Sequence, residues 1–285
     1  MSPELLYLLR RQIRTAGPMR FDEFMNLVLY SDPHGYYRHH IPGADSDYRT
    51  SPSLTPWFGR LVAEDLKAVW EELGEPETFT VAEVGAGGGD LAASAVDAAE
   101  GAFKQALRWT LVEPIDTIAK LQRFRLGSSD RFRWVESLDA LEPVTGVIVA
   151  HEVLDNFPFR LFEVGEQGPV EVRVGVARNH LTEVRFALGQ EVADLVGPAL
   201  EHLEVGDRFE LRTNVESWVA GCARALERGR LLIVDYGELE PEIWTSHPAG
   251  SMVTYRRGRL GKDPFEDVGD ADITAHVNFS QLGRG

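Results

Sequence analysis

A glycine-rich turn between a predicted strand and a predicted helix constrains this chain most. The segment from Val81 to Leu91 reads Val-Ala-Glu-Val-Gly-Ala-Gly-Gly-Gly-Asp-Leu. Branched residues that run into clustered glycines predict a buried strand, a tight turn and a helix start. Glycines allow positive φ angles and let a ligand approach the backbone N–H groups at the helix start. The segment therefore predicts an α/β domain that binds a nucleotide-like ligand, with a tight turn that binds nothing as the alternative.

The spacing of the glycines narrows the class of ligand. Gly85, Gly87 and Gly89 form a G-x-G-x-G pattern, and Asp90 stands where the dinucleotide fingerprint G-x-G-x-x-G has its third glycine. Glu83 lies two residues before the first glycine, and a fixed carboxylate suits a cationic ligand better than a polyphosphate. We therefore expect a sulfonium nucleoside, and a nucleotide-dependent oxidoreductase is the less favoured alternative.

Two further predicted strand ends carry side chains that suit a nucleoside. Glu113 directly follows the predicted strand 107–112, at the place where α/β nucleotide sites bind ribose hydroxyl groups. A hydrogen bond to an ionised group contributes roughly 1.5–3 kcal/mol, so this carboxylate can change the affinity about tenfold or more. Ser137 and Leu138 follow the predicted strand 131–135. We expect the polar group and the apolar side chain to contact an adenine.

The segment after the fourth predicted strand, 145–150, holds the candidate catalytic residues. His151 and Glu152 begin a near match to the zinc motif H-E-x-x-H, but Asp155 replaces the second histidine and the segment follows a strand. We therefore expect no metal. Ligands of parallel sheets bind beyond the carboxyl ends of the strands, so we expect Glu152 and Asp155 to present carboxylates to the substrate. Capping or salt bridging at the strand end is the alternative.

The order of the predicted elements gives an α/β fold. With 285 residues, 44% of them apolar, the chain can bury a sizeable core. Residues 1–76 show helical spacing and predict a helical cover, and residues 77–285 predict the sheet domain. Within it, residues 159–212 alternate like antiparallel strands, turn at 178–180 and continue into a helix near 191–203, which predicts an inserted hairpin. The strands of the parallel sheet are predicted at 79–84, 107–112, 131–135, 145–150 and 230–236.

Composition excludes several classes of partner. The chain has 45 acidic and 29 basic side chains and a net charge of −16, which repels the phosphate backbone of nucleic acids. The single cysteine, Cys222, cannot form an internal disulfide or a multi-cysteine zinc site and suits a reducing compartment. Apolar runs fall far short of the ~20 residues of a membrane-spanning helix. We therefore expect a cytoplasmic protein that binds neither nucleic acid nor membrane.

Motifs along nearly the whole chain resemble the MidA-type family of S-adenosylmethionine-dependent methyltransferases, whose mitochondrial members are protein arginine methyltransferases needed for complex I assembly. The family's E-x-G-x-G-x-G-x-L corresponds to Glu83 to Leu91, and its Asn-Glu-x-x-Asp-x-x-Pro is similar to residues 151–158. The other matching motifs are Gly35-Tyr36-Tyr37, Asp47-Tyr48, Thr50-Ser51-Pro52, Val112-Glu113-Pro114, Asp235-Tyr236-Gly237 and Asp272-Ile273-Thr274-Ala275-His276-Val277-Asn278-Phe279.

The resemblance implies a class I, Rossmann-like sheet with a helical N-terminal cover, a loop that caps the cofactor and a hairpin insertion that forms the acceptor cleft. It implies methyl transfer to an arginine nitrogen of a protein, with Glu152 and Asp155 as catalytic residues. A catalytically inactive cofactor-binding assembly protein and a small-molecule O- or N-methyltransferase stay open as alternatives. The residues expected to bind S-adenosylmethionine are Thr50, Ser51, Glu83, Gly85, Gly87, Gly89, Leu91, Glu113, Ser137, Leu138 and Glu152.

The chain departs from the family pattern in three places. His151 stands where the family has Asn, and Ala86 and Gly88 replace the Pro and Arg of the glycine turn. The chain ends soon after the Asp-Ile-Thr-Ala-His segment, where relatives continue through the last two strands of the sheet. We therefore expect a sheet without those strands, with residues 231–234 near an open edge. Either the chain is a shortened family member that pairs through this exposed apolar edge with a second copy into a homodimer, or it is a fragment.

Overall fold

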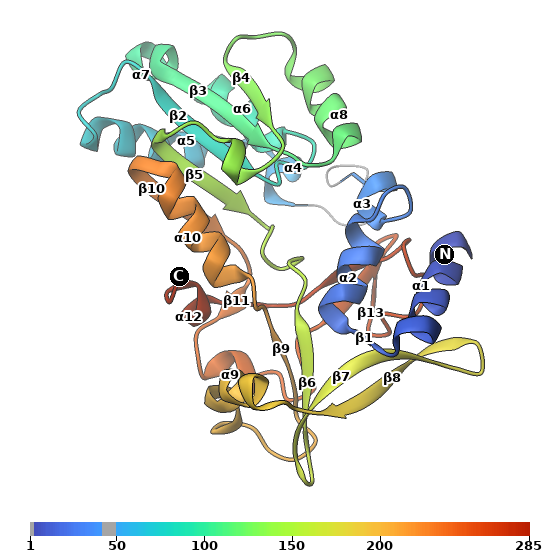
Figure 1. The fold of residues 1–285 in the computed structure, drawn as a ribbon. Helices are drawn as coiled ribbons and strands as arrows, with labels where there is room; N and C mark the ends of the chain where they lie inside the picture. Colours follow the sequence, from blue (N-terminus) through green and yellow to red (C-terminus); the bar gives the residue numbers. More distant parts are fainter. Residues whose placement is uncertain (1–2, 42–49) are drawn as a thin grey trace. The chain divides into compact units, whose positions relative to one another are not determined.

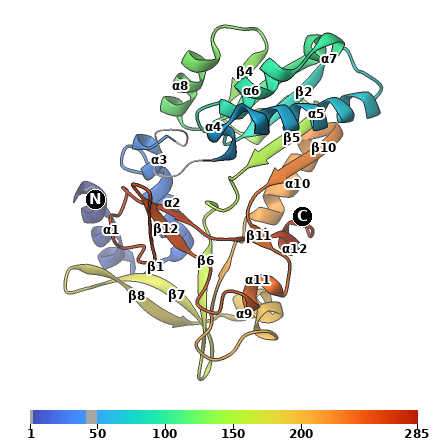
Figure 2. The ribbon, with the colours of Figure 1, turned by 180° about the vertical axis from the view of Figure 1, so that it is seen from behind.

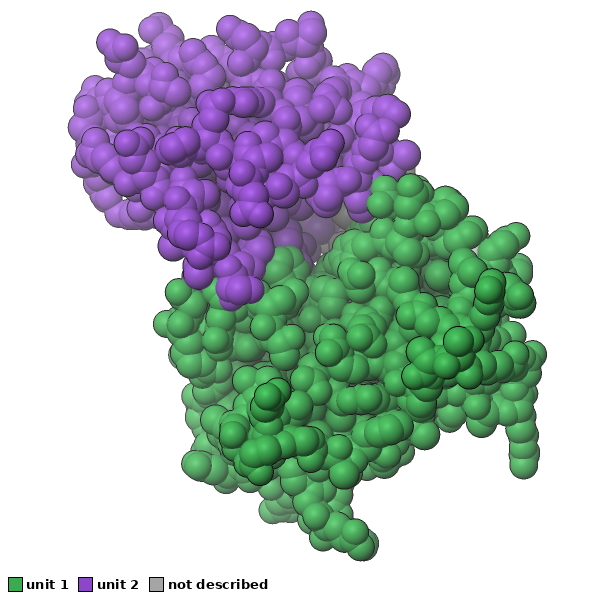
Figure 3. Space-filling model, viewed as in Figure 1, with its two compact units in different colours: residues 1–39, 155–216, 236–285 green, residues 40–154, 217–235 purple. Residues whose placement is uncertain are grey.

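The computed structural model describes residues 3–41 and 50–285. The segment 42–49, which contains the Asp47-Tyr48 motif, lies outside the described residues. The chain divides into two compact units (Figure 3). Unit 1 consists of residues 1–39, 155–216 and 236–285, and unit 2 of residues 40–154 and 217–235.

Unit 2 is built on a parallel sheet of five strands in the order β10-β5-β2-β3-β4 (Figure 1). The predicted α/β class is confirmed. Two predicted strands match to the residue, and the largest difference is that the last strand begins and ends earlier than predicted. β10 lies at one edge of this sheet; dimerisation through that edge stays a prediction. The strands are β2 (Phe79–Val84), β3 (Leu107–Val112), β4 (Phe132–Val135), β5 (Val144–His151) and β10 (Leu226–Val234).

Successive side chains of each strand point to opposite faces of this sheet, and each face carries a hydrophobic core. Val81 points into a core shared with Leu66, both with no exposed surface, while the next residue, Ala82, packs on the other face against Cys222. Fully burying such a branched side chain contributes roughly 1.5–3 kcal/mol. Figure 2 shows α5 and α6 over the first face. The helices of unit 2 are α4 (Ser51–Leu54), α5 (Pro56–Glu72), α6 (Asp90–Ala98), α7 (Gly101–Ala106), α8 (Asp116–Leu126), a 3-10 turn at Leu138–Ala140, and most of α10 (Val215–Ala225).

Unit 1 contains an antiparallel sheet formed largely by the predicted insertion. Its order is β1-β7-β6-β9, and β8 pairs with β7. The β7–β8 hairpin turns through Arg178 and Asn179, which both have positive φ angles of 48° and 66°, as a two-residue hairpin turn of the primed type requires. The predicted hairpin and its following helix are confirmed. The elements are β1 (Met19–Arg20), β6 (Arg160–Gly165), β7 (Gly168–Ala177), β8 (His180–Ala187), α9 (Gln190–Leu200) and β9 (Arg208–Leu211).

The remaining parts of unit 1 are short elements at both ends of the chain. The N-terminal ones are α1 (Pro3–Ala16), α2 (Phe21–Tyr30) and α3 (Tyr36–His39). The C-terminal ones are β11 (Gly237–Glu238), α11 (Glu242–Thr245), β12 (Val253–Arg256), β13 (Arg259–Gly261), β14 (Asp272–Thr274), β15 (Val277–Asn278) and α12 (Phe279–Leu282). Strands this short carry too few residues for a readable periodicity.

The two compact units differ from the predicted division at residue 76. Helix α5 buries Val62, Leu66 and Val69 in the same core as β2, so packing groups it with the parallel sheet. Helices α1 and α2 instead contact β7, so packing groups them with the insertion. In the part of the chain that the structure describes, no helix combines the length and the apolar character needed to cross a membrane.

Candidate functional site

Four of the predicted cofactor-binding groups of unit 2 follow neighbouring strands, at the carboxyl ends of its sheet. Val84, the last residue of β2, pairs with Val112 of β3 and with Ala150 of β5, and Val112 pairs with Val135 of β4. The residues that come next in each strand therefore emerge side by side. They are the glycine turn after β2, Glu113 after β3, Ser137 after β4 and Glu152 after β5.

The glycine turn has the backbone that its sequence predicts. Gly85, Gly87 and Gly89 have φ angles of 65°, 50° and 83°, and Gly89 is the N-terminal cap of α6. At Gly85 a Cβ atom would lie 2.6 Å from Cγ2 of Val153, so glycine is needed there for space as well as for conformation. The turn leaves backbone N–H groups at a helix start, the kind of position that binds polar ligand groups.

Glu113 is buried and held by the protein. It is 7% exposed. Its Oε1 accepts a hydrogen bond from the backbone N–H of Ile115 at 2.9 Å, and its Oε2 accepts one from Nε2 of Gln122 at 3.3 Å. Each carboxylate oxygen can accept more than one hydrogen bond. A carboxylate fixed in this way can therefore still accept hydrogen bonds from hydroxyl groups.

Gln122 is a site residue that the sequence analysis missed. Its side chain has no exposed surface. Nε2 also donates to the carbonyl oxygen of Gly87 at 2.9 Å, and Oε1 accepts from Nε1 of Trp134 at 3.0 Å. It therefore joins the glycine turn to Glu113. The sequence feature that could have revealed Gln122 is its position on the same helix face as Ile118 and Ala119, the other buried residues of α8. A polar residue on a buried face must find hydrogen-bond partners inside the protein.

Glu83 differs from its predicted role. Its side chain is 3% exposed, and its Oε2 accepts a hydrogen bond from Nε1 of Trp109 at 2.8 Å. Burial raises the pKa of this carboxyl to about 8, and the Trp109 hydrogen bond opposes that shift only in part. The group is therefore mostly protonated at neutral pH. The argument from a fixed charge to a cationic ligand does not hold for Glu83, and the visible effect of its carboxyl is to position Trp109 in the core.

His151 and Glu152 form a polar pair at the end of β5. Nε2 of His151 lies 3.4 Å from Oε1 of Glu152. Burial lowers the pKa of His151 to about 4, so the imidazole is neutral at pH 7, and its ring packs 4.7 Å from that of Phe58. Glu152 has a φ angle of 48°, which is uncommon for a residue with a side chain, and such backbone strain concentrates at functional sites.

The remaining predicted cofactor residues occupy different environments. Leu91 is 2% exposed and packs in the core under α6, so its side chain contributes to that packing. Leu138 packs against the core around Cys222. Thr50 is the N-terminal cap residue of α4, the helix that begins at Ser51 and contacts α6. Ser137 is exposed. Their contacts with a cofactor stay predictions.

Asp155 belongs to unit 1, and its surroundings there are buried and polar. It is 6% exposed. Its Oδ2 accepts hydrogen bonds from the hydroxyl groups of Tyr236 and Thr274 at 2.5 and 2.7 Å. Asp272 lies in the same cluster, where burial and the charge of Asp155 raise its pKa to about 8. This arrangement gives Asp155 a structural role within unit 1 beside its predicted catalytic one.

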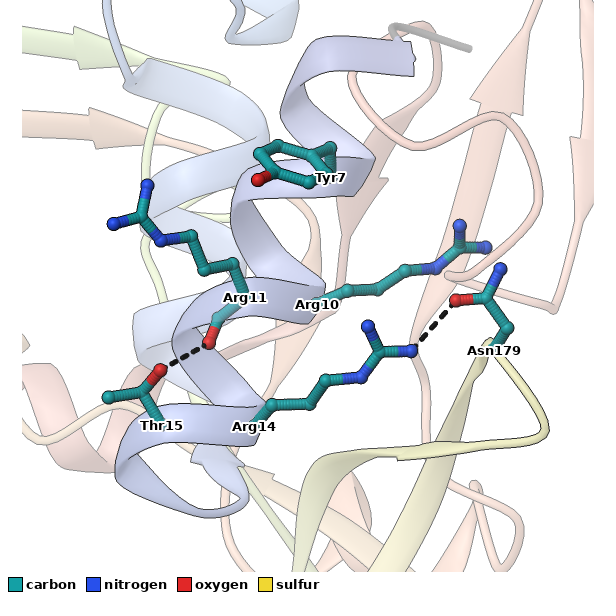
Figure 4. A pocket seen from close by; sticks show the side chains of 6 residues that line it. All are labelled: Tyr7, Arg10, Arg11, Arg14, Thr15 and Asn179. Atoms are coloured by element: carbon teal, nitrogen blue, oxygen red, sulfur yellow. Dashed lines mark hydrogen bonds between the residues drawn. The ribbon is translucent and has the colours of Figure 1, made fainter.

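A second feature of unit 1 was not predicted. A cavity of about 310 Å³ lies between α1 and the β7–β8 hairpin, and Figure 4 shows the side chains that line it. Nη2 of Arg14 donates to Oδ1 of Asn179 across it at 2.8 Å. The cavity shares no residue with the strand ends of unit 2. It is lined by Tyr7, Arg10, Arg11, Arg14, Thr15 and Asn179.

The strand ends of unit 2 fit S-adenosylmethionine better than a dinucleotide. The positive-φ glycine turn and the fixed carboxylate of Glu113 suit a nucleoside. Asp90 opens α6 with a carboxylate, and its Oδ2 lies 3.6 Å from Nη1 of Arg125. A carboxylate at this helix start would repel a pyrophosphate.

Known proteins resemble this chain over nearly its whole length. The Drosophila melanogaster "Protein arginine methyltransferase NDUFAF7 homolog, mitochondrial" is 28% identical over 305 residues, which cover 95% of this chain and 67% of that protein. The human "Protein arginine methyltransferase NDUFAF7, mitochondrial" is 26% identical over 100% of this chain and 69% of its own. A Burkholderia thailandensis protein, crystallised with S-adenosyl-homocysteine, superimposes with a TM-score of 0.88 at 30% identity, over 99% of this chain and 77% of that chain.

These relatives correct one expectation. The predicted cytoplasmic location is contradicted, because the curated relatives are mitochondrial proteins. The prediction rested on a single cysteine and on apolar runs too short to span a membrane. Those features indicate a reducing environment but do not separate the cytosol from other compartments.

The family model itself matches residues 61–284, which include the glycine turn, Glu113 and the segment after β5. The match confirms the enzyme class and the cofactor, and rejects the oxidoreductase alternative. This chain belongs to the family of S-adenosyl-L-methionine-dependent methyltransferases.

Proposed function

We propose that this methyltransferase transfers a methyl group to an arginine nitrogen of a protein. The observation that carries the proposal is the pair of His151 and Glu152 at the end of β5, a neutral imidazole beside a carboxylate on a strained backbone. Relatives named as protein arginine methyltransferases support the same acceptor.

S-adenosylmethionine supplies the methyl group on a positively charged sulfonium. Glu113 would accept hydrogen bonds from the ribose hydroxyl groups, since Ile115 and Gln122 already orient its carboxylate. Backbone N–H groups of the turn at Gly85 to Gly89 would bind the polar end of the molecule. Ser137 and Leu138 would contact the adenine, and Thr50 and Ser51 are proposed to cap it. Because the glycine turn, Glu113 and Ser137 follow neighbouring strands, the sheet fixes the spacing of these three.

Glu152 is the proposed contact for the acceptor. A guanidinium group presents a planar fork of N–H donors that a carboxylate accepts through two hydrogen bonds. Because His151 is neutral at pH 7, it does not offset the negative charge of Glu152. That charge would offset the repulsion between a cationic guanidinium and the sulfonium. Glu152 would then hold the acceptor nitrogen roughly 3–3.5 Å from the methyl carbon, and this orientation would supply much of the rate acceleration of methyl transfer.

Two further points bear on the acceptor. The net charge of −16 favours encounters with basic protein segments, although charge does not select arginine over lysine. Asp155 is kept as a proposed contributor to turnover, and its burial among Tyr236 and Thr274 suggests that it acts by positioning those side chains.

The test is methyl transfer from radiolabelled S-adenosylmethionine into a lysate of the source cell. Labelled protein is digested to amino acids, and the label is identified by chromatography. We expect labelled methylarginine and a loss of more than about tenfold in the rate for Glu152→Gln. The matched control is Glu166→Gln, since Glu166 is an exposed glutamate away from the strand ends.

The alternatives give different outcomes. Label on lysine, or only in the small-molecule fraction, would replace arginine with another acceptor. Binding of S-adenosyl-homocysteine without transfer to any pool would favour a cofactor-binding assembly protein that has lost catalysis. Equal rates for Glu152→Gln and the unsubstituted chain would remove Glu152 from the acceptor site.

A further inference from the structure

Three potential metal ligands meet in the C-terminal part of unit 1, far from the predicted site residues in sequence. Glu238 is the second residue of β11, His247 follows α11, and His276 precedes β15. The side chains come from three separate segments that fold together. They do not form a motif that the sequence spacing could reveal.

The donor atoms of these side chains converge. Nε2 of His247 lies 3.1 Å from Oε1 of Glu238, and Nδ1 of His276 lies 3.1 Å from the same oxygen. One donor atom from each residue can be chosen so that all lie within 4.8 Å of one another. The two imidazole rings are 4.5 Å apart at an angle of 68°. Ligand atoms around a tetrahedral zinc ion, with bonds of about 2.0–2.2 Å, lie roughly 3.3–3.6 Å apart. Small side-chain rotations are therefore enough to surround an ion.

The chemistry of the set matches a borderline divalent cation. Two imidazoles and one carboxylate are the ligands of zinc in several hydrolytic enzymes and suit other first-row transition metals. The Glu238 carboxylate lies within hydrogen-bond distance of both imidazoles, so its oxygen already sits where a shared ion would need it. In the described part of the chain, the ion-pair partners of Glu238 are the two histidines.

Neighbouring groups hold the cluster in place while leaving it accessible. The backbone N–H of His276 donates to Oγ of Ser251 at 3.0 Å, and the ring of Tyr236 packs at 5.3 Å from the His276 ring. The side chains of His247, Glu238 and His276 keep 25%, 29% and 31% of their surface exposed. An ion could therefore enter from solvent and keep water in its remaining coordination positions.

We propose that Glu238, His247 and His276 form a site for a divalent transition-metal ion, with Zn²⁺ as the best match to the donor set. The ion would cross-link β11, the segment after α11 and the segment before β15, a region whose strands are only two to four residues long. Its effect would then be to stabilise the C-terminal part of unit 1. The site is independent of the proposed methyl transfer.

The test is titration of the full-length chain, stripped with a chelator, with Zn²⁺ alone by isothermal calorimetry, without S-adenosylmethionine. We expect one saturable site per chain. His247→Ala or His276→Ala should weaken Zn²⁺ binding more than about tenfold. Substituting even the residues that hydrogen-bond to metal ligands lowers metal affinity roughly 10–100-fold. Glu238→Gln keeps the side-chain size and should weaken it similarly. His180→Ala is the matched control, because His180 is an exposed histidine of unit 1.

Two further measurements separate a specific site from surface binding. Co²⁺ in place of Zn²⁺ should give visible absorption bands that vanish in His276→Ala. Zn²⁺ should raise the melting temperature of the unsubstituted chain and of His180→Ala, but not of Glu238→Gln. The proposal is overturned if no saturable binding occurs, or if all three ligand variants bind Zn²⁺ as tightly as the His180→Ala control. Circular dichroism of metal-free Glu238→Gln checks that this variant is folded.

Discussion

The side-chain amide of Gln122 lies 3.3 Å from the carboxylate of Glu113 and donates a hydrogen bond to it. The same nitrogen donates to the carbonyl oxygen of Gly87 at 2.9 Å. One buried amide thus couples the carboxylate after β3 to the glycine turn after β2. The two ends of the proposed nucleoside site are held at a fixed spacing by a residue that need not touch the ligand.

This coupling makes Gln122 a positioning residue. Gln122→Ala should lower the affinity for S-adenosyl-homocysteine roughly fivefold to tenfold, because the hydrogen bond to the side chain of Glu113 is lost. Glu113→Ala should lower it by at least as much. The double variant should lose less than the sum of the two free-energy changes, since both act on one network. Calorimetric titration measures all three. Gln105→Ala, an exposed glutamine in α7, is the control, and additive losses would contradict the coupling.

Glu83 should make stability depend on pH. Its pKa in the folded chain is raised from 4.5 to about 8 by burial, so the folded state binds the proton more tightly than the unfolded state. The stabilisation from this group is complete at low pH and is lost as the pH rises towards 8. As the pH rises from about 5 to 7.5, the free energy of unfolding of Glu83→Gln should therefore increase relative to that of the unsubstituted chain, by about 1.4 kcal/mol per pH unit.

Urea unfolding at several pH values measures this difference. Glu77→Gln, an exposed glutamate near the start of β2, should show no such slope. A constant difference between Glu83→Gln and the unsubstituted chain across the pH range would mean that Glu83 is ionised in the folded protein.

Gly85 should resist substitution for two separable reasons. Gly85→Ala should cost roughly 1–2 kcal/mol of unfolding free energy from the left-handed backbone alone, with an added cost because the new Cβ would lie 2.6 Å from Val153 Cγ2. Gly74 has a φ angle of 85° with nothing near its Cβ position, so Gly74→Ala should show only the first cost. Adding Val153→Ala should reduce the loss in Gly85→Ala. Denaturant titration gives all the values, and equal losses for both alanine variants would remove the steric argument.

Asp155 should matter for turnover more than for cofactor binding. Asp155→Asn keeps the size of the side chain but removes the charge that accepts hydrogen bonds from Tyr236 and Thr274. We expect a lower kcat with little change in the affinity for S-adenosyl-homocysteine. The pKa of Asp272 should also fall, because the charge of Asp155 helps to raise it.

Enzyme assays, calorimetry and NMR titration check these outcomes separately. Asp194→Asn, an exposed aspartate of α9, is the control. Unchanged kcat together with a lowered Asp272 pKa would show that Asp155 serves only the structure of unit 1.

The sequence alone determined the parallel sheet, the turn at Gly85 to Gly89, the hairpin at 178–179 and the position of Glu113. These features depend on residues close together in the chain, where periodicity and backbone preference act directly. The strand ends also follow from sequence, because parallel pairing brings the carboxyl ends of strands to one edge.

Only the tertiary structure decided the protonation and the partners of the site residues. The sequence pattern favours Glu83 as a fixed charge beside the glycine turn, but its burial against Trp109 keeps it mostly protonated at pH 7. Gln122 and the cluster of Glu238, His247 and His276 depend on contacts between segments distant in the chain. Desolvation and long-range packing set these properties, and neither is encoded in the spacing of neighbouring residues.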